Sequence, residues 1–398
     1  MFRPRVLAAP SIALALAICS TRASAALPDI DISGFGTGGF VFTDTGKAEF
    51  GRSQFQPVGA NSEGDVGVDS LFALQGTVHL TDIFSVTTQG MVRRMFGPSF
   101  EFDIPVLFVK AELTRDLSVR VGRIQLPVFM VSDYREVGYS NTWIRPPIEV
   151  YGQIPFDSDD GADILYRKTI GPVDVSTQAF YGKTDFSTPT ASVQSRRNWG
   201  ANVNITVGPL SLYAGHDQSA FSSEDPTVTQ LLTAVNAAGF TALANRLNLL
   251  NVPYKFTDFG FSLNDTHLTL QGEVSKSTPG GFLSSSDGQY VLAGYRVGKF
   301  TPYGMYARQK VTSERTDTTI PQVGPLIPLA QGVDQLIDSF GADQHTISAG
   351  LRWDLHTSVD LKLQIDRVSP DGNGLFINPV PGFHGPVLVG SMTLDFVF

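Results

Sequence analysis

Apolar and polar residues alternate along many short segments of this chain. In HLTLQGEVSK (residues 267–276), every second residue from Leu268 onward is apolar or glycine, and the residues between them are polar. The segment SVDLKLQIDR (358–367) shows the same alternation. Because successive side chains of a β-strand point to opposite faces, this pattern predicts strands with one apolar and one polar face. About sixteen such segments follow one another along the chain.

The connections between these segments alternate in length. Short ones are expected at residues 81–82, 114–116, 170–172, 207–209, 264–266, 297–299 and 355–357. Long ones are expected at residues 43–66, 96–103, 126–160, 183–196, 218–254, 276–288, 312–344 and 368–385. Bacterial transmembrane barrels have tight turns at one end and long loops at the other, whereas a soluble β-sandwich has no reason to sort its loops by end. The sequence therefore predicts an all-β fold, a transmembrane antiparallel β-barrel of about 16 strands. A secreted soluble β-sandwich that binds ligands is the alternative.

The final segment, GSMTLDFVF, is a two-faced strand that stops on an aromatic residue. Leu394, Phe396 and Phe398 lie on its apolar row, which we expect to face lipid, with Phe398 in the aromatic girdle of the barrel. Gram-negative outer-membrane barrels commonly end in this way, and the chain resembles them here. The resemblance implies that Phe396 and Phe398 belong to the membrane-insertion strand, which the outer-membrane assembly machinery reads.

The first residues have the composition of an export signal. A basic start (MFRPR), an apolar run and the motif ASA predict a secretory signal peptide over residues 1–25 and an outer-membrane barrel over residues 26–398. Removal of its three arginines would change the formal net charge from −9 to −12, which argues against nucleic acid as a partner. It would also remove Cys19, the only cysteine, and with it disulfide and thiol chemistry.

The third long connection is the candidate for the functional site. Sixteen strands enclose a lumen too wide for side chains to fill, so water occupies it. The connection reads LPVFMVSDYREVGYSNTWIRPPIEVYGQIPFDSDD (126–160) and is stiffened by four prolines. Its position resembles that of the third loop of general porins, which implies that it folds into the lumen as a constriction. The candidate constriction residues are Asp133, Arg135, Glu136, Arg145 and Glu149, and the candidate residues of the pore wall are Arg93, Lys110, Arg120 and Arg123.

The charges of this loop have two interpretations. Acidic groups on the loop that face basic groups on the wall would create a transverse field and select ions by the sign of their charge. Alternatively, these charges pair with one another and hold the loop in place. The basic wall favours anions, whereas the acidic loop and the net charge favour cations, so the sequence leaves the sign of any preference open.

A longer stretch carries a more specific resemblance. VRVGRIQLPVFMVSDYREVGYSNTWIRPPIEVYG (119–152) resembles a segment of a group of proteobacterial porin-like proteins that are distantly similar to the phosphate-selective porins. The general-porin signature PEFGG is absent, so no eyelet residue is carried over. The resemblance implies a porin in the lipid of the outer membrane of a Gram-negative bacterium. It would be a water-filled channel for passive diffusion of small hydrophilic solutes and ions, usually a homotrimer, and it would need no cofactor. The alternative is a substrate-specific channel for phosphate or another small anion.

Other chemistry is weakly indicated. None of the six histidines lies beside a nucleophile motif, so we expect a protein that is not an enzyme. The segment DSDDGAD (157–163) suggests an acidic loop end, with bound calcium as the alternative, although Gly161 stands where an EF-type loop needs an oxygen ligand. Residues 225–250 and 328–340 have helical composition and are expected to pack on the outer mouth of the barrel.

Overall fold

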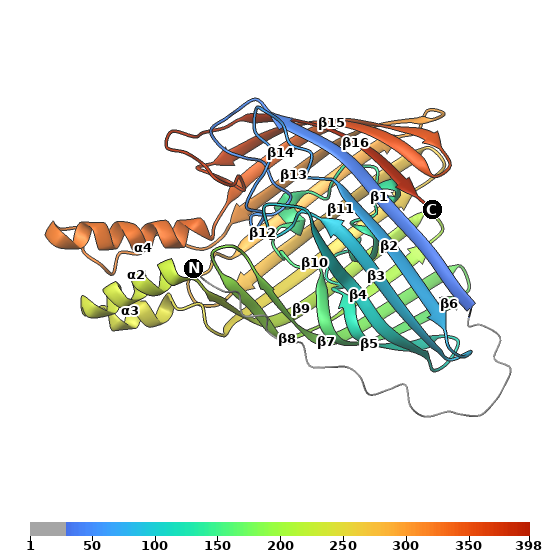
Figure 1. Cartoon of the computed structure of the whole chain (residues 1–398), viewed down its shortest axis with the longest axis horizontal. Coiled ribbons are helices and arrows are strands. Elements are labelled where there is room, and N and C mark those ends of the chain that lie inside the picture. Colours follow the sequence, from blue (N-terminus) through green and yellow to red (C-terminus); the bar gives the residue numbers. More distant parts are fainter. Residues whose placement is uncertain (1–28) are drawn as a thin grey trace, which may run out of the picture.

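The computed structural model describes residues 29–398, which form a closed antiparallel barrel of sixteen strands (Figure 1). The strands are β1 (Asp29–Thr43), β2 (Leu71–His79), β3 (Phe84–Arg93), β4 (Glu101–Glu112), β5 (Leu117–Gln125), β6 (Ser158–Ile170), β7 (Val173–Ser187), β8 (Ser192–Val207), β9 (Leu210–Glu224), β10 (Val252–Asn264), β11 (Leu268–Pro279), β12 (Ser286–Tyr295), β13 (Phe300–Val311), β14 (Asp343–His356), β15 (Val359–Asp371) and β16 (Val387–Val397). Each strand pairs with its neighbours in sequence, and β1 closes the ring by pairing with β16. The predicted signal peptide, residues 1–25, lies outside the described residues.

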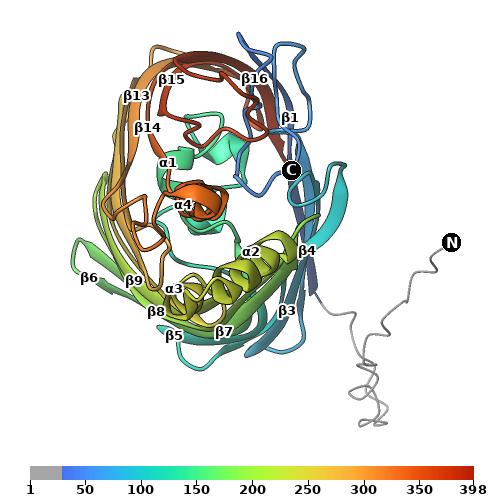
Figure 2. The ribbon, with the colours of Figure 1, turned by 90° about the vertical axis from the view of Figure 1, so that its left-hand side faces the viewer.

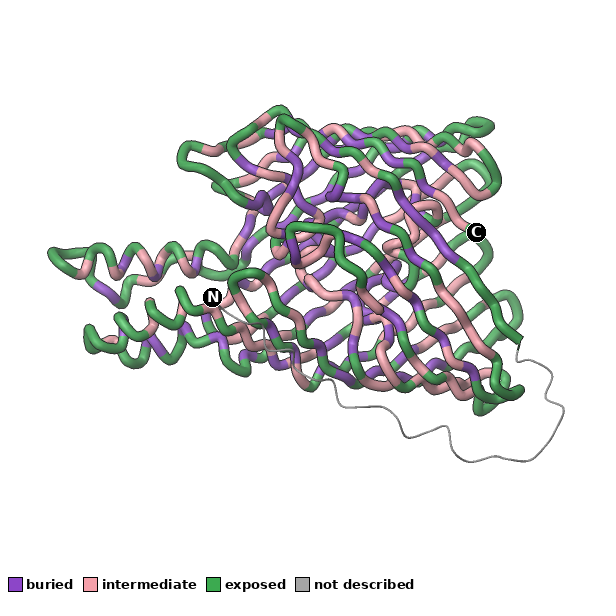
Figure 3. Tube along the Cα trace, in the orientation of Figure 1, coloured by how far each residue is buried: buried purple, intermediate pink, exposed green. Residues whose placement is uncertain are grey.

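The apolar rows of the strands face outward, as the alternation predicted. On β16, Met392 and Leu394 are 46% and 43% exposed, whereas Ser391 and Thr393 are 6% and 0% exposed. Figure 3 shows the same alternation of exposed and buried positions along other strands. The predicted barrel of sixteen strands is therefore confirmed, and the β-sandwich alternative is wrong because the sheet is closed and its apolar rows lie on the outer surface. Among the described residues, no helix combines the length and apolar character needed to cross a membrane.

The seam between β1 and β16 includes Phe398. Its backbone N–H donates to the carbonyl of Gly34, and the N–H of Gly34 donates to the carbonyl of Phe398, both at 2.9 Å. The Phe398 ring lies over Gly34 and the Phe396 ring over Gly36, so neither glycine position has room for a side chain. Phenyl rings that cover glycines of the neighbouring strand compensate for the missing side chains and stabilise the pairing.

With the exception of 188–191, the connections are sorted by length between the two ends of the barrel. One end has the short connections 80–83, 113–116, 171–172, 208–209, 265–267, 296–299 and 357–358. The other end has the connections 44–70, 94–100, 126–157, 188–191, 225–251, 280–285, 312–342 and 372–386. Three connections at this end, 188–191, 225–251 and 280–285, are shorter than predicted by seven to ten residues because the flanking strands continue further than their apolar alternation indicated.

Three helices project beyond the long-loop end (Figure 1). They are α2 (Pro226–Ala237), α3 (Thr241–Arg246) and α4 (Ile327–Ser339), which confirms the predicted helical segments. They share a core in which Val235, Leu247 and Val333 are 0–1% exposed. The helices therefore pack chiefly on one another and extend past the strand ends, whereas the sequence placed them against the mouth of the barrel.

Candidate functional site

The connection between β5 and β6 contacts inward-facing side chains on distant strands. It contains the short helices η1 (Ser132–Tyr134), η2 (Gly138–Ser140) and α1 (Ile148–Tyr151). The backbone N–H of Met130 donates to Glu273 of β11 at 3.1 Å, and that of Ile144 donates to the amide oxygen of Gln364 of β15 at 3.3 Å. Figure 2, which views the barrel from the end that carries the projecting helices, shows α1 inside the ring of strands.

Arg145 of this connection is surrounded by carboxylates. Its side chain is 5% exposed, and its guanidinium donates to Asp69 at 2.9 and 2.5 Å and to the hydroxyl of Ser391 at 2.6 Å. A second carboxylate, that of Asp366, lies 3.4 Å away. Burial alone would lower the pKa of Arg145, but the two carboxylates outweigh it and raise the pKa above its usual range. Here a base on the loop faces acids, the reverse of the arrangement that the sequence suggested.

Glu149 of α1 is buried without a cation. It is 2% exposed and accepts hydrogen bonds from the side-chain amide of Gln344 at 2.9 Å and from the hydroxyl of Thr346. It forms no ion pair with any described residue. Burial raises the pKa of its carboxyl above the usual range. Glu149 therefore anchors α1 on β14 through hydrogen bonds and faces no basic group of the wall.

At one point acids of the loop do meet a base of the wall. Arg93 of β3 contacts Asp157 at 2.6 Å, and Glu136 is bridged by Arg52 at 3.1 Å and by Arg135 at 3.3 Å. Burial would raise the pKa of Asp157 and of Glu136, but these arginines lower both values below the usual range. Arg93 also contacts Asp103 of β4 at 3.2 Å, so this arginine cluster (Arg52, Arg93, Asp103, Arg135, Glu136 and Asp157) has three bases and three acids.

The other predicted residues differ in their surroundings. Asp133 of η1 is exposed and makes no hydrogen bond or ion pair with the described residues. Arg120 points inward and contacts Asp163 of β6 at 2.5 Å, and Lys110, on the inward row of β4, contacts Glu112 at 2.7 Å. The wall bases are thus paired with neighbouring carboxylates.

Arg123 does not line the pore wall. It lies on the outward row of β5, opposite the exposed Leu107 and beside Asp160 at 2.7 Å. The strand alternation already required this, because Arg120 and Arg123 are three residues apart and therefore point to opposite faces. The sequence prediction placed Arg123 by its charge and not by its row.

The family follows from comparison with known proteins. A sequence profile described as Gram-negative porin matches residues 11–373. The chain belongs to this family. As a member of it, this porin is an outer-membrane channel for diffusion of small solutes, and its family and fold point to a channel rather than an enzyme. A comparison with curated proteins found no match.

Solved outer-membrane proteins share the fold of this porin at low sequence identity. OmpF of Salmonella typhi in complex with daunomycin is 11% identical, with a TM-score of 0.57 and coverage of 93% of this chain and 98% of that chain. An anion-selective porin from Comamonas acidovorans is 14% identical, with a TM-score of 0.53 and coverage of 93% and 99%. The trimer form of OmpT, an outer membrane protein of Vibrio cholerae folded in vitro, is 11% identical, with a TM-score of 0.53 and coverage of 94% and 100%. These likenesses show a shared fold and do not single out the phosphate-selective porins.

Two further bases of this porin were missed from the sequence. Lys362 of β15 is fully buried, lies 3.0 Å from Asp395 and donates to the carbonyl of Gly138 in the loop at 2.5 Å. Arg352 of β14 donates to the carbonyl of Tyr139 at 2.7 Å. Both lie on polar rows that the alternation identifies, but the carbonyls that they bind belong to a loop more than 200 positions away in sequence.

The acidic segment of this porin is also placed differently from the prediction. Residues 158–163 begin β6, so DSDDGAD continues into a strand and does not form a loop end. Asp159 points inward, 2.7 Å from the side-chain amide of Asn198, whereas Asp160 points outward toward Arg123. Within residues 29–398, no group of three or more potential ligands is placed to hold a metal ion.

Proposed function

We propose that residues 126–157 form the constriction of this porin and decide which solutes pass. The observation that carries the proposal is the attachment of this connection to β11 through Met130, to β14 through Glu149, and to β15 and β16 through Arg145. A segment that is attached to the wall at several distant points narrows the lumen at a fixed place. Diffusion through the remaining opening is passive, and we assign the protein no enzymatic activity and no cofactor.

The charge distribution supports a general channel over a site for phosphate or another small anion. An anion site needs cationic donors that are free of carboxylates. Arg93, Arg120 and Arg145 each contact a carboxylate within 2.6 Å. Phosphate would therefore have to displace an existing partner at each of these bases.

We propose a weak preference for cations. The interior carries carboxylates that pair with no base among the described residues, including Asp258 and Glu273. Asp133 is the acid of the constriction that is exposed, so it acts on a passing ion most directly. A unit charge about 8 Å from an ion in water contributes about 0.5 kcal/mol, with opposite signs for a cation and an anion. Screening at about 0.1 M salt roughly halves each contribution, so the ratio of cation to anion permeability changes about twofold.

Reversal potentials in a KCl gradient across planar bilayers test this proposal. Asp133→Asn should lower the ratio of potassium to chloride permeability about twofold. Glu314→Gln, which removes an exposed acid from the connection 312–342, is the matched control and should leave the ratio unchanged. A wild-type channel that prefers chloride would refute the cation preference. An unchanged ratio in Asp133→Asn would show that ions do not pass this side chain.

We also propose a homotrimer in the lipid of the outer membrane. One solved neighbour is described as a trimer, and the seam of this chain presents a flat outer face on which Phe72, Phe396 and Phe398 lie side by side with ring centroids 6.3–6.4 Å apart. Flat apolar faces pack well against a second copy. Phe396 and Phe398 remain the proposed contact of the outer-membrane assembly machinery. Native mass spectrometry of the purified protein gives the subunit number directly.

A further inference from the structure

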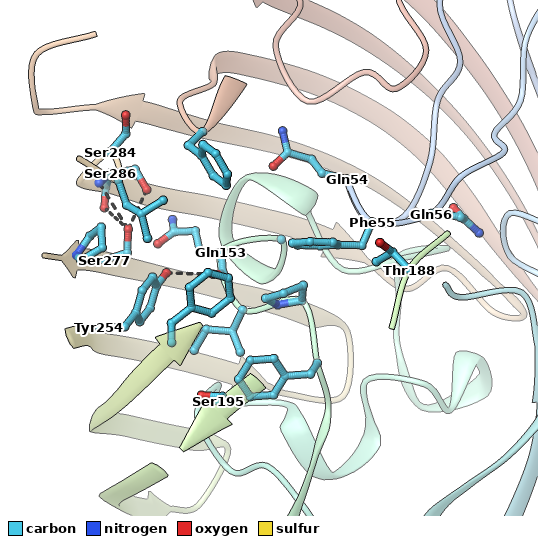
Figure 4. Close-up of a pocket in the computed structure, with 18 of the residues that line it drawn as sticks. Gln54, Phe55, Gln56, Gln153, Thr188, Ser195, Tyr254, Ser277, Ser284 and Ser286 are labelled. Atoms are coloured by element: carbon cyan, nitrogen blue, oxygen red, sulfur yellow. Dashed lines mark hydrogen bonds between the residues drawn. The ribbon is translucent and has the colours of Figure 1, made fainter. Parts of the chain in front are cut away.

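A cavity of about 550 Å³ lies on the long-loop side of the constriction (Figure 4). Residues 54–57 of the first connection, 152–156 of the third and 188–190 of the β7–β8 hairpin line it, together with side chains of β8–β13. Its volume is within the range of pockets that hold small molecules. Because residues of the proposed constriction form part of its wall, a solute held here lies directly before the narrowest part of the channel.

The lining of this cavity differs in charge from the rest of the interior. Among the described residues that line it there is one carboxylate, Asp217, and no lysine, arginine or histidine. Amides and hydroxyls take the place of charges, and Gln54, Gln153 and Gln309 are among them. A carboxylate or phosphate solute would therefore find no cation to pair with at this site.

Aromatic side chains supply the second part of the lining. Phe55 and Phe156 come from the first and third connections, and Tyr254 comes from β10. Figure 4 shows Phe55 and Gln153 reaching the cavity from different connections, with Tyr254 on the strand side. The Tyr254 hydroxyl donates to the carbonyl of Gln153 at 2.8 Å, which fixes the position of its ring.

Some polar groups in this wall lack a partner within the protein. The amide oxygens of Gln153 and Gln309 and the hydroxyl of Ser284 are buried and make no hydrogen bond with the described residues. Because these three atoms have almost no accessible surface, a solute in the cavity does not reach them in this conformation, and the exposed side-chain amide of Gln54 is the one that it meets. An amide offers a donor beside an acceptor, which matches a pair of adjacent hydroxyl groups.

We infer that this cavity binds a neutral carbohydrate of one or two rings. Aromatic faces pack against the C–H face of a sugar ring, and the amides and hydroxyls bond to its hydroxyl groups. An anion lacks a cationic partner here, and a purely apolar solute would leave the amides unsatisfied. This inference rests on the proposed function, because it names a class of solute that the channel collects before the constriction.

Current through the reconstituted full-length protein in planar bilayers tests the inference, with maltose, succinate and inorganic phosphate as probes. Maltose should reduce the ion current at a concentration at least about tenfold lower than succinate or phosphate. Equal effects of all three probes would overturn the neutral class of ligand. A conducting channel that maltose leaves unaffected would overturn the inference while leaving the porin function intact, whereas a protein that conducts no ions would refute the proposed function itself.

Two variants locate the site. Phe55→Ala should weaken the maltose effect about tenfold and Gln54→Ala about threefold, each measured relative to the sugar-free current of the same variant. The matched controls are Phe100→Ala and Gln335→Ala, which remove exposed side chains that do not line the cavity and should change the effect less than twofold. The Phe55 ring packs edge-to-face against the Phe186 ring, with the centroids 5.7 Å apart, so its loss could disturb the fold. The mobility of the unheated protein on a gel checks that Phe55→Ala is folded. A maltose effect that persists at full strength in both cavity variants would place the sugar elsewhere and overturn the assignment.

Discussion

Arg145 should be the strongest single anchor of the third connection. Replacing it by methionine leaves Asp69 and Asp366, 2% and 4% exposed, without the cation that lies between them. Removing one partner of a buried ion pair costs about 3–5 kcal/mol. With the unfolding entropy per residue of globular domains, a loss of about 4 kcal/mol lowers the thermal midpoint of a barrel of this size by about 5 °C. Arg145→Met should therefore lower the midpoint by that amount and remove the contacts of the loop with Asp366 of β15 and Ser391 of β16 that Arg145 makes.

Two assays follow this change. Thermal unfolding, monitored by the loss of the heat-modifiable band, measures stability, and single-channel recording measures the opening, which should show larger and noisier conductance. Arg315→Met is the matched control, because the ion pair of Arg315 with Asp338 is partly exposed and should contribute less than about 1 kcal/mol. Arg145→Met combined with Asp69→Asn should recover part of the midpoint. The reasoning fails if Arg145→Met has the midpoint and conductance of the wild type.

Further predictions concern pH, barrel closure and ion preference. Because burial raises the pKa of Glu149, the folded protein loses stability as pH rises from about 4.3, the unfolded value, through the raised value. Glu149→Gln should remove that part of the loss, and midpoints between pH 4.5 and 8 that have the same slope in both proteins would contradict the assignment. Gly34→Val should displace the Phe398 ring and reduce the heat-modifiable fraction by more than about half, whereas Gly38→Val, on the same row with open space around it, should assemble normally. Equal assembly of the two variants would show that the ring contact does not matter for closure. Asp133→Asn should lower the ratio of potassium to chloride permeability about twofold, as measured by the reversal potential in a KCl gradient.

The strand pattern could be predicted from the sequence because the polarity of each row of side chains on a strand depends only on whether that row faces lipid or water. An apolar row that meets lipid and a polar row that meets water alternate with a period of two, so HLTLQGEVSK and SVDLKLQIDR identify their faces without knowledge of distant residues. Strict use of this rule would also have placed Arg123 outward. The ends of β7 and β8 were less predictable, because their strand pairing continues past the apolar rows.

The contacts of the loop could not be predicted in the same way. Arg145 is separated from Asp69 by 76 positions and from Asp366 by 221. Periodicity carries no information about which distant side chain a loop residue meets. The composition of the loop therefore indicated a charged segment, while only the closed barrel shows that Arg145 meets carboxylates and that Glu149 meets an amide and a hydroxyl.

The long separation between Arg145 and its partners has a consequence for assembly. Asp366 and Ser391 belong to β15 and β16, the last strands to be synthesised. Arg145 in the loop after β5 therefore cannot make these two contacts until almost the whole chain has been synthesised. In a barrel intermediate that lacks these strands, the loop is held only by its contacts with earlier strands, such as those of Met130 and Glu149. The constriction is therefore completed only when the last two strands close the barrel. Until then, an incomplete barrel would have a wider and less defined opening.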